Sequence, residues 1–330
     1  MLPLSPFRLE QPVTVEEAVA HLSVDPQGTR LCAGGTDLVP NIKHGLHTPN
    51  VVVHLGRVGG LKDIQHQDGV LRLGSMVTLH GLSQDELVKR HAPGLAQAAG
   101  MVAGPQIRRM GTLGGNLCLD TRCLYYNQTH FWREALGHCL KKDGTVCHVV
   151  AGGRRCVAAA SNDTATVLLA LNASVTIQSV RGTAALPLGQ FYVADGVHNT
   201  VLKPDELVVG VQVPTHPRRR EGFAKLRHRA AIDFPMLNVA VCVALDDGGA
   251  VERLGVAISA LAARPVVLDT VRFVGRLPDA ALLDEVATLA HTRCVPLSNI
   301  CDDPQWRREM VPVLVRRAWK DAVSSPAAAG

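Results

Sequence analysis

The stretches AGGTDL, residues 33–38, and TLGGN, residues 112–116, each place two adjacent glycines beside small polar side chains. Paired glycines let backbone N–H groups approach an anion closely, which forms a nest for a phosphate or pyrophosphate. A single Gly-Gly pair is common in plain turns, but two such turns in one region favour anion binding. The chain contains neither G-x-G-x-x-G nor G-x-x-x-x-G-K-[ST]. The sequence therefore disfavours a Rossmann site and a P-loop, and a bound dinucleotide would need a different cradle.

Around these two turns, the hydrophobic pattern predicts a mixture of helices and strands. The first helix is expected at residues 14–22, because Thr14 precedes an apolar repeat and Glu17 follows three residues later, as in a capping box. The other predicted elements before residue 215 are a strand at 50–55, two strand-like pieces within 71–82, a helical stretch at 83–103 ending before Gly104-Pro105, a buried helix and strand within 164–180, and a strand at 206–214.

The composition changes at PTHPRRREG, residues 214–222, which reads as a linker. Two apolar strands are expected at 234–247 and 251–261, joined by an Asp-Asp-Gly-Gly turn that is typical of a hairpin. Helices are expected at 279–292 and 304–323. The whole pattern indicates an α+β protein with a larger N-terminal region and a smaller C-terminal domain.

Charge and hydropathy exclude several classes of protein. The 330 residues carry a net charge of +5, with 47% hydrophobic and 19% charged residues, as in a soluble globular protein. No apolar run approaches the roughly 18 residues of a membrane span. Arg8 and Glu10 stand where a signal peptide needs an apolar core, so we expect a cytoplasmic protein. The basic stretch at 216–229 reads as a solvated loop or as a docking face for an acidic partner, and no nucleic-acid-binding signature accompanies it.

Residues 123–156 hold four of the nine cysteines, with the spacing C-x15-C-x7-C-x8-C. The odd total and a reducing compartment disfavour a disulfide framework. The absence of a close C-x2-C pair disfavours zinc, although His130, His138 and His148 are candidate zinc ligands. Four thiolates are the ligand set of a [4Fe–4S] cluster, and inert clustered thiols are the remaining alternative.

Other residues of this segment bear on the same choice. A loop of this length needs its own core or a metal to hold it. Its aromatic residues are Tyr125, Tyr126, Phe131 and Trp132. Its cationic residues are Lys141, Lys142, Arg154 and Arg155, which either offset the charge of a thiolate-bound cluster or form a solvated rim.

Three stretches together resemble a known family: AGGTDLVPNIKHG at 33–45, IRRMGTLGGNLC at 107–118 and FAKLRHRAAIDFP at 223–235. They resemble the FAD-binding medium subunits of the xanthine oxidase and carbon monoxide dehydrogenase family of molybdenum hydroxylases, and the resemblance extends over essentially the whole chain. It implies a two-part FAD-binding domain of the molybdopterin-dehydrogenase (PCMH-like) type at 1–216, followed by a CO dehydrogenase flavoprotein C-terminal-like domain at 217–330. The subdomains would span about 1–58 and 59–216, with a cysteine-rich loop at 118–156.

The resemblance also assigns cofactor-binding residues by position. The two glycine turns would hold the FAD pyrophosphate, Val102 would lie near the adenine, Asp163 would bind the sugar-like chain and Lys225 would lie close to the isoalloxazine. Leu124 would contact FAD beside the first cluster cysteine. The full set is Leu31, Ala33, Gly34, Gly35, Thr36, Asp37, Val102, Thr112, Gly114, Gly115, Asn116, Leu124, Asp163 and Lys225.

The cysteine-rich stretch is similar to an inserted loop of the β subunits of 4-hydroxybenzoyl-CoA reductases, a branch of this family; most other relatives lack the loop. The similarity implies an extra [4Fe–4S] cluster. Its ligands would be Cys123, Cys139, Cys147 and Cys156. The cysteines expected in the core are Cys32, Cys118, Cys242, Cys294 and Cys301.

The function implied by this resemblance is electron transfer rather than substrate chemistry. The chain would join a molybdopterin-binding large subunit and a small subunit with two [2Fe–2S] clusters in a dimer of heterotrimers. Electrons from reduced ferredoxin would pass through [4Fe–4S] and FAD to the molybdenum centre. Two alternatives stay open: a flavoprotein subunit that passes electrons to NAD or a quinone, and a non-catalytic binding protein whose cysteine loop is a zinc-stabilised platform.

Overall fold

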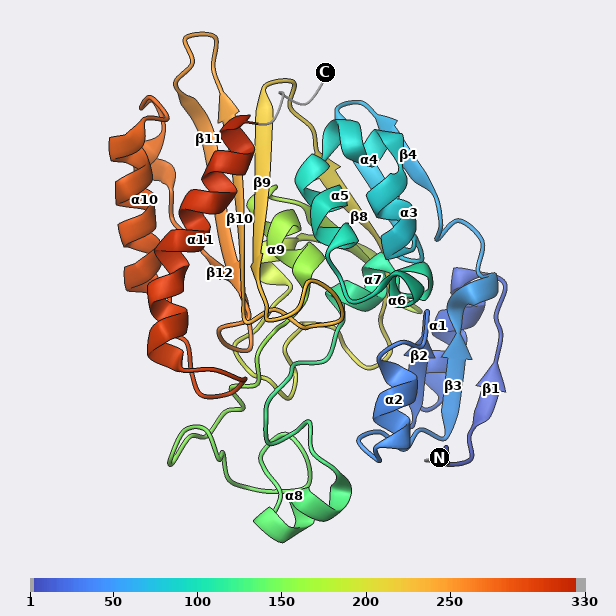
Figure 1. Ribbon diagram of the computed structural model, residues 1–330. Helices are drawn as coiled ribbons and strands as arrows, with labels where there is room; N and C mark the ends of the chain where they lie inside the picture. Colours follow the sequence, from blue (N-terminus) through green and yellow to red (C-terminus); the bar gives the residue numbers. More distant parts are fainter. Residues whose placement is uncertain (1–2, 325–330) are drawn as a thin grey trace.

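The computed structural model describes residues 3–324 as a mixed α/β molecule with three sheets (Figure 1). The N-terminal unit has a parallel sheet in the order β1-β3-β2, and α1 begins after Thr14, whose side chain accepts a hydrogen bond from the Glu17 N–H. The capped helix predicted at 14–22 is therefore confirmed. The elements of this unit are β1 (Arg8–Glu10), α1 (Val15–Val24), β2 (Thr29–Cys32), α2 (Leu38–Lys43), β3 (Val51–His54) and η1 (Leu55–Arg57).

The second unit is built on a five-stranded antiparallel sheet in the order β4-β5-β8-β6-β7. Its strands are β4 (Ile64–Gln67), β5 (Val70–Gly74), β6 (Ser174–Ser179), β7 (Gly182–Pro187) and β8 (Leu207–Pro214). Its helices are α3 (Leu79–Gln84), α4 (Glu86–His91), α5 (Pro93–Gly100), α6 (Pro105–Met110), α7 (Leu113–Leu117), α9 (Asp163–Ala170) and η2 (Leu188–Gln190). Helix α8 (His130–Leu136) lies in the long segment between α7 and α9, which projects from the lower end of the molecule in Figure 1.

Two local predictions in this unit are wrong. Within 71–82 only the first piece is a strand, because Thr78 caps a helix that begins at Leu79. The stretch TLGGN is the capped start of α7 rather than a plain turn, with Thr112 accepting from the Gly115 N–H. The chain also resumes a helix at Pro105, whose fixed φ suits the first helical position.

The C-terminal domain is a four-stranded antiparallel sheet, β12-β11-β10-β9, covered by α10 and α11 (Figure 1). Alternate residues of β10 face opposite sides: Val239 and Val241 pack with the two helices, whereas Ala240 and Cys242 belong to the core of the second unit. The predicted hairpin and both predicted helices are confirmed. The elements are β9 (Arg219–Leu226), β10 (Leu237–Leu245), β11 (Val251–Ser259), β12 (Val266–Val267), η3 (Val271–Phe273), α10 (Ala280–Arg293) and α11 (Pro304–Ser324).

The basic segment expected to be a linker is partly structural. Arg219 begins β9, is buried, and forms an ion pair with the buried Glu221 at 2.8 Å. The same guanidinium donates to the carbonyl of His91, and Glu221 accepts from the Gly94 N–H at 2.9 Å. The reading of this stretch as a solvated loop is therefore wrong for Arg219, which clamps the two domains together. Among residues 3–324, no helix has the length and apolar character needed to cross a membrane.

Candidate functional site

A cavity of about 370 Å³ lies where the N-terminal unit meets the second unit, and its volume is in the range of small-molecule sites, roughly 300–1,000 Å³. Both glycine segments line it. Of the residues predicted to bind FAD, those that line the cavity are Leu31, Ala33, Gly34, Gly35, Thr36, Asp37, Val102, Thr112, Gly114, Gly115, Asn116 and Asp163. The structure therefore brings together segments that are far apart in the sequence.

The two glycine segments touch through their backbones. A Cβ added at Gly34 would stand 1.8 Å from the carbonyl oxygen of Met110, just before the second segment. Gly35 has a φ of +70°, a conformation that L side chains rarely adopt. Beside them, the buried hydroxyl of Ser75, another lining residue, has no hydrogen-bond partner among the described residues. A glycine in the left-handed conformation and an unpaired hydroxyl suit a polar, anionic ligand.

Asp37, the last polar residue of the first segment, contacts the cysteine-rich segment. Its carboxylate pairs with the Arg122 guanidinium, and it also accepts from the Asn41 side-chain amide at 3.0 Å. Burial raises the pKa of Asp37, and Arg122 opposes that shift. The wall of the cavity is thus tied to the residue that precedes Cys123.

Asp163 begins α9 at the inner wall of the cavity. Its buried carboxylate pairs with Lys225 at 3.0 Å and accepts from the Asn238 side-chain amide at 3.0 Å. Burial raises the pKa of this carboxyl, and the Lys225 ammonium opposes the shift. Lys225 stands behind Asp163 and does not line the cavity, and neither does Leu124, which is 43% exposed. Their contacts with FAD stay predictions.

Asn116 also has a structural role, and its predicted contact with FAD stays a prediction. Its side-chain oxygen accepts from the backbone N–H of Thr164 at 3.1 Å and from the Thr164 hydroxyl at 2.5 Å. These bonds fix α7 to the start of α9. The Asn116 oxygen therefore orients the cradle instead of facing an anion.

Sequence reasoning missed several lining residues, which are Arg30, His47, Ser75, Cys118, Asp120, Ile232 and Phe234. Cys118 was expected in the core, but it is exposed and opens onto the cavity. Ile232 has a φ of +74°, which is an outlier for a β-branched residue, and its N–H donates to the carbonyl of Ala103 at 3.0 Å. The stretch AAIDF carries no local signal for this position, because only the tertiary fold brings it to the cavity.

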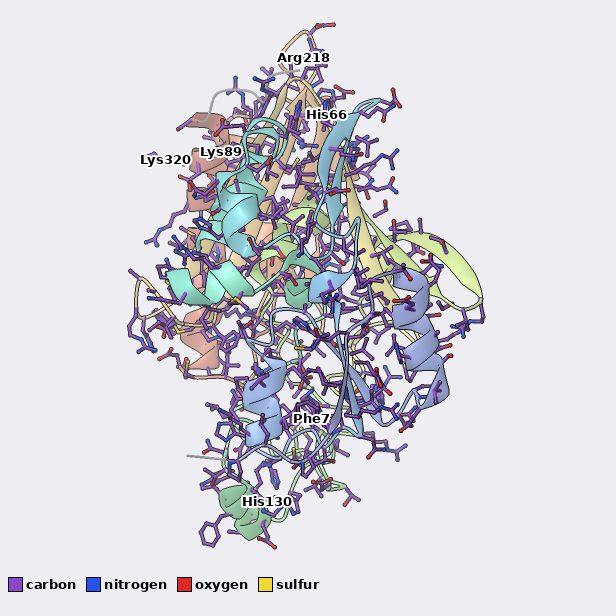
Figure 2. The ribbon with its side chains drawn as sticks, turned by 90° about the vertical axis from the view of Figure 1, so that its right-hand side faces the viewer. Phe7, His66, Lys89, His130, Arg218 and Lys320 are labelled. Carbon is purple, nitrogen blue, oxygen red and sulfur yellow. The ribbon has the colours of Figure 1, made fainter. Side chains whose placement is uncertain are left out.

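The cysteine-rich segment encloses a second, smaller cavity. It is lined by Cys123, Cys139, Cys147 and Cys156, together with Tyr125, Tyr126, Leu140, Lys141, His148, Val149, Val157 and Ala158. Cys123, Tyr126 and Cys156 also belong to a small apolar cluster. His130, labelled in Figure 2, marks α8 at the outer end of this segment.

The arrangement of thiols in this cavity differs from a site for one metal ion. Within residues 3–324, no three His, Cys, Asp or Glu side chains come close enough together to hold a single ion. In a cubane each thiolate binds a different iron, so the sulfurs stand further apart than the ligands of one zinc. Four thiols around one cavity suit the donor set of a cubane.

Lys141 is the cation nearest to this cavity and is not part of a solvated rim. Its side chain is 4% exposed, pairs with Asp120 at 2.7 Å and lies over the Tyr126 ring. Burial would raise the pKa of Asp120, but Lys141 and Tyr126 hold it below its usual value. Burial raises the pKa of the Cys156 thiol to about 11, and Lys141 opposes that shift. By contrast, Arg154 and Arg155 are exposed.

Two family models match the chain. Residues 5–216 match the FAD binding domain in molybdopterin dehydrogenase, and residues 222–322 match the CO dehydrogenase flavoprotein C-terminal domain. The chain belongs to the FAD-binding medium subunits of the molybdenum hydroxylase family. Binding of FAD by this medium subunit agrees with the glycine cradle and the unpaired Ser75 hydroxyl of the larger cavity.

Curated relatives cover most of this medium subunit. It is 28% identical to the nicotine 6-hydroxylase medium subunit of Paenarthrobacter nicotinovorans, over 97% of this chain and 98% of the relative. It is 26% identical to the carbon monoxide dehydrogenase medium chain of Afipia carboxidovorans, over 96% of each chain. It is 32% identical to an Escherichia coli aldehyde oxidoreductase FAD-binding subunit, over 76% of this chain and 81% of the relative.

Solved structures support the same fold for the medium subunit. A carbon monoxide dehydrogenase from Hydrogenophaga pseudoflava superposes with a TM-score of 0.80 at 22% identity, covering 98% of this chain and 99% of the other. Quinoline 2-oxidoreductase from Pseudomonas putida 86 superposes with a TM-score of 0.77 at 22% identity, covering 98% of both chains. The predicted α+β fold class is therefore confirmed.

The remaining cysteines of the medium subunit divide into two groups. Cys242 and Cys294 are buried, as expected for core thiols. Cys32 is half-buried, and Cys301 is exposed, so the core assignment of Cys301 is wrong. Cys301 lies in the segment before α11, where the chain runs along the surface.

Proposed function

We propose that this subunit holds a [4Fe–4S] cluster on Cys123, Cys139, Cys147 and Cys156 as well as FAD. In this proposal it relays electrons from reduced ferredoxin, through the cluster and FAD, to the other subunits of a 4-hydroxybenzoyl-CoA reductase. The complex would remove the phenolic hydroxyl group of its substrate and release benzoyl-CoA and water. The molybdenum active site would belong to another subunit, and this chain would position its redox groups and adjust their potentials.

The observation that supports the cluster most directly is the convergence of four cysteines. They are spread from residue 123 to residue 156, yet all four line one cavity. The same walls contain Tyr126 and the nearly buried Lys141, so the cavity is sheltered and has one cation close by. A cation of this kind offsets the net negative charge of a thiolate-bound cluster.

The position of the two cavities supports direct transfer between their cofactors. Asp120 lines the larger cavity, and Cys123 lines the smaller one three residues later. Three residues span at most about 11 Å even when the chain is fully extended. A cluster in the smaller cavity would therefore lie close to FAD in the larger one.

The partners and boundaries are also part of this proposal. The carbon monoxide dehydrogenase relatives are named medium chains, which supports a complex with a molybdopterin-binding large subunit and a small subunit that has two [2Fe–2S] clusters. We expect a dimer of such heterotrimers in the cytoplasm. The FAD-binding residues and the domain division at 216/217 are proposed on the same footing.

The alternative is that FAD passes electrons to NAD or a quinone. Relatives named xanthine dehydrogenase FAD-binding subunit and nicotinate dehydrogenase FAD-subunit support it, because their names describe dehydrogenases. On this alternative the cysteine loop holds zinc or no metal. The two functions therefore predict different iron contents.

The test is the cofactor content of anaerobically purified protein. We expect flavin absorption bands together with broad iron–sulfur absorption, and about four irons per chain. Cys139→Ser should remove the iron–sulfur absorption and retain FAD, because the glycine segments lie outside the loop. Cys301→Ser, at an exposed thiol outside both cavities, is the control and should retain both cofactors. Wild-type protein with flavin but no iron would overturn the proposed cluster.

A second experiment tests the electron donor. The assembled complex should reduce 4-hydroxybenzoyl-CoA with reduced ferredoxin as the donor, and the rate should fall as ionic strength rises if charge steers the encounter. Turnover with NADH in place of ferredoxin would favour the alternative. A rate that does not change with salt would remove the support for electrostatic docking.

A further inference from the structure

Helix α2 and the turn that follows it lie between the larger cavity and the cysteine-rich segment. Asp37, Leu38 and Asn41 line the larger cavity. The cysteine-rich segment packs against the same stretch: the buried Arg133 of α8 donates to the carbonyl of His44 at 3.3 Å, and Leu46 belongs to the apolar cluster that includes Cys123 and Cys156. Helix α2 therefore contacts both the larger cavity and the segment that encloses the smaller one.

Arg122 forms the polar contact between the cysteine-rich segment and the wall of the larger cavity. Its guanidinium pairs with Asp37, donates to the Asn41 side chain at 3.2 Å, and lies over the Phe234 ring, 5.7 Å from its centroid. Asp37, Asn41 and Phe234 all line the larger cavity, although Arg122 itself does not. The Arg122 Nε is buried and has no partner among the described residues. The polar contacts of the guanidinium are therefore made by its two terminal nitrogens.

The backbone of Arg122 is fixed as firmly as its side chain. Its N–H donates to the carbonyl of Ala159 at 2.9 Å, and its carbonyl accepts from the Ala159 N–H at 2.6 Å. This bridge joins the two ends of the cysteine-rich segment, with Cys123 following one partner and Cys156 preceding the other by three residues. Arg122 therefore contacts the wall of the larger cavity through its side chain and closes the cysteine-rich segment through its backbone.

We propose that Arg122 is a positioning residue that couples the two cofactor sites: FAD in the larger cavity orders the cysteine loop, and a loaded loop strengthens FAD binding. This inference rests on the proposed function. Because binding free energies are linked, the factor by which the cluster tightens FAD must equal the factor by which FAD tightens the cluster. Coupling energies of this kind typically correspond to roughly 5- to 150-fold changes in affinity.

The charges explain why this position needs an arginine. FAD brings a pyrophosphate to the cradle that includes Asp37, and Arg122 keeps that carboxylate from repelling it. Removing the guanidinium leaves a buried carboxylate without its cation. Lysine is a poor replacement, because its ammonium lacks the planar fork with which the guanidinium binds Asp37 and Asn41 while it stacks on Phe234.

The chain offers a matched control. Arg155 immediately precedes Cys156, as Arg122 precedes Cys123, but it is exposed and has no hydrogen-bond or ion-pair partner within residues 3–324. Arg155→Gln therefore removes a positive charge beside a cysteine, as Arg122→Gln does, but removes no contact with the wall of the larger cavity.

The experiment compares wild type, Arg122→Gln, Arg122→Lys and Arg155→Gln by two measurements. The first is hydrogen exchange of residues 123–156 with and without FAD. The second is the FAD dissociation constant, from the quenching of flavin fluorescence, in iron-loaded and iron-depleted protein. In wild type and Arg155→Gln, FAD should slow exchange in the loop, and iron should tighten FAD by about tenfold. In both Arg122 variants the slowing should be lost and the ratio of dissociation constants should approach one.

The outcomes separate this inference from the proposed function. The coupling is overturned if FAD protects the loop from exchange as strongly in Arg122→Lys as in wild type. It is also overturned if FAD does not protect the loop in wild type. Wild-type protein that holds no iron but shows Arg122-dependent protection retains the coupling and overturns the cluster. If Arg122→Gln fails to fold, the milder Arg122→Lys decides, because it keeps the charge and loses only the shared contacts.

Discussion

Gly34 has no room for a side chain at the point where the two glycine segments meet. A methyl group there would overlap the Met110 carbonyl, which is backbone and cannot move aside without shifting α6 and α7. The requirement is for close approach between two backbones, and it is separate from the left-handed conformation of the next residue. The first segment can therefore tolerate Ala33 but not an alanine one position later.

We predict that Gly34→Ala destabilises the fold by about 1–3 kcal/mol and lowers FAD occupancy, because overpacking forces the cradle apart. Thermal unfolding and the flavin-to-protein absorbance ratio measure both effects. Gly59→Ala is the control, since its Cβ would meet nothing within 4 Å. Equal FAD content in Gly34→Ala and wild type would show that the contact between segments is not needed for the cradle.

Cys118 offers a direct probe of the cavity. Its thiol opens onto the cavity wall, so bound FAD should shield it. Burial raises the pKa of this thiol to about 12, so alkylation needs a high pH or a long exposure to the reagent. Under those conditions we predict that a small alkylating reagent modifies Cys118 in FAD-free protein and leaves it unmodified in FAD-bound protein, as measured by peptide mass spectrometry. Cys301, exposed outside the cavity, should react in both states. Equal labelling of Cys118 in both states would place FAD elsewhere.

At the scale of elements, α11 depends on one buried cation that has no carboxylate partner within residues 3–324. Arg307 donates to the carbonyls of Met236, Leu297 and Ala260, at 3.1, 2.9 and 2.6 Å. These bonds hold the start of the helix against the residue before β10 and the residue after β11. Burial lowers the pKa of Arg307, but arginine stays charged at any working pH.

We predict that Arg307→Ala lowers the free energy of unfolding by about 3 kcal/mol or more, because three buried carbonyls lose their donor. Arg316, also on α11, makes an exposed ion pair with Asp284 of α10 and a long bond to the Pro312 carbonyl, so Arg316→Ala should cost no more than about 1 kcal/mol. Chemical denaturation measures both changes. Similar values for the two variants would contradict the role of the buried cation.

The sequence pattern of the cysteine loop predicts less than its structure shows. The spacing of its cysteines leaves zinc, a cubane and inert thiols open, because a sequence does not say which side chains face one cavity. Of the aromatic residues of the loop, Tyr126 belongs to its apolar cluster, whereas Phe131 is 80% exposed on α8. Helix α8 has an apolar side formed by Phe131, Trp132, Ala135 and Leu136, yet these residues are exposed and Arg133 is buried. The sequence therefore does not say which side of this helix faces the protein.

At the scale of the whole molecule, the two domains share one core and one buried polar network. Asp163 of the FAD-binding region takes its partners, Lys225 and Asn238, from the C-terminal domain. Helix α9 also packs against β11, where a Cβ at Gly255 would stand 2.0 Å from the carbonyl of Ala170. The cavity wall is therefore built by both domains.

We predict that residues 1–216 expressed alone bind FAD at least about tenfold more weakly than the full chain, since Asp163 would lose both buried partners. Isothermal titration with FAD measures the difference, and circular dichroism checks that the fragment is folded. A folded fragment with undiminished affinity would mean that the C-terminal domain contributes nothing to the site.

Much of this protein can be read from its residues alone. Capping residues, apolar periodicity and the Asp-Asp-Gly-Gly turn predict α1, α9 and the β10–β11 hairpin, because these elements depend on neighbours in the sequence. The stretch at 71–82 misleads for the same reason: its apolar run suits a strand or a helix, and the Thr78 cap decides. Family resemblance adds the glycine cradle, which no general nucleotide motif would have found.

The sequence by itself determined the α+β class, the two glycine segments and the family, since these follow from local pattern and motif. Only the tertiary structure decided that Arg219 is buried, that Cys118 opens onto the cavity, that Lys225 pairs with Asp163 and that Arg122 pairs with Asp37. The physical reason is that burial and pairing depend on groups distant in sequence. The amino-acid sequence gives the charge of Arg122, but only the fold places Asp37, Asn41 and Phe234 around it.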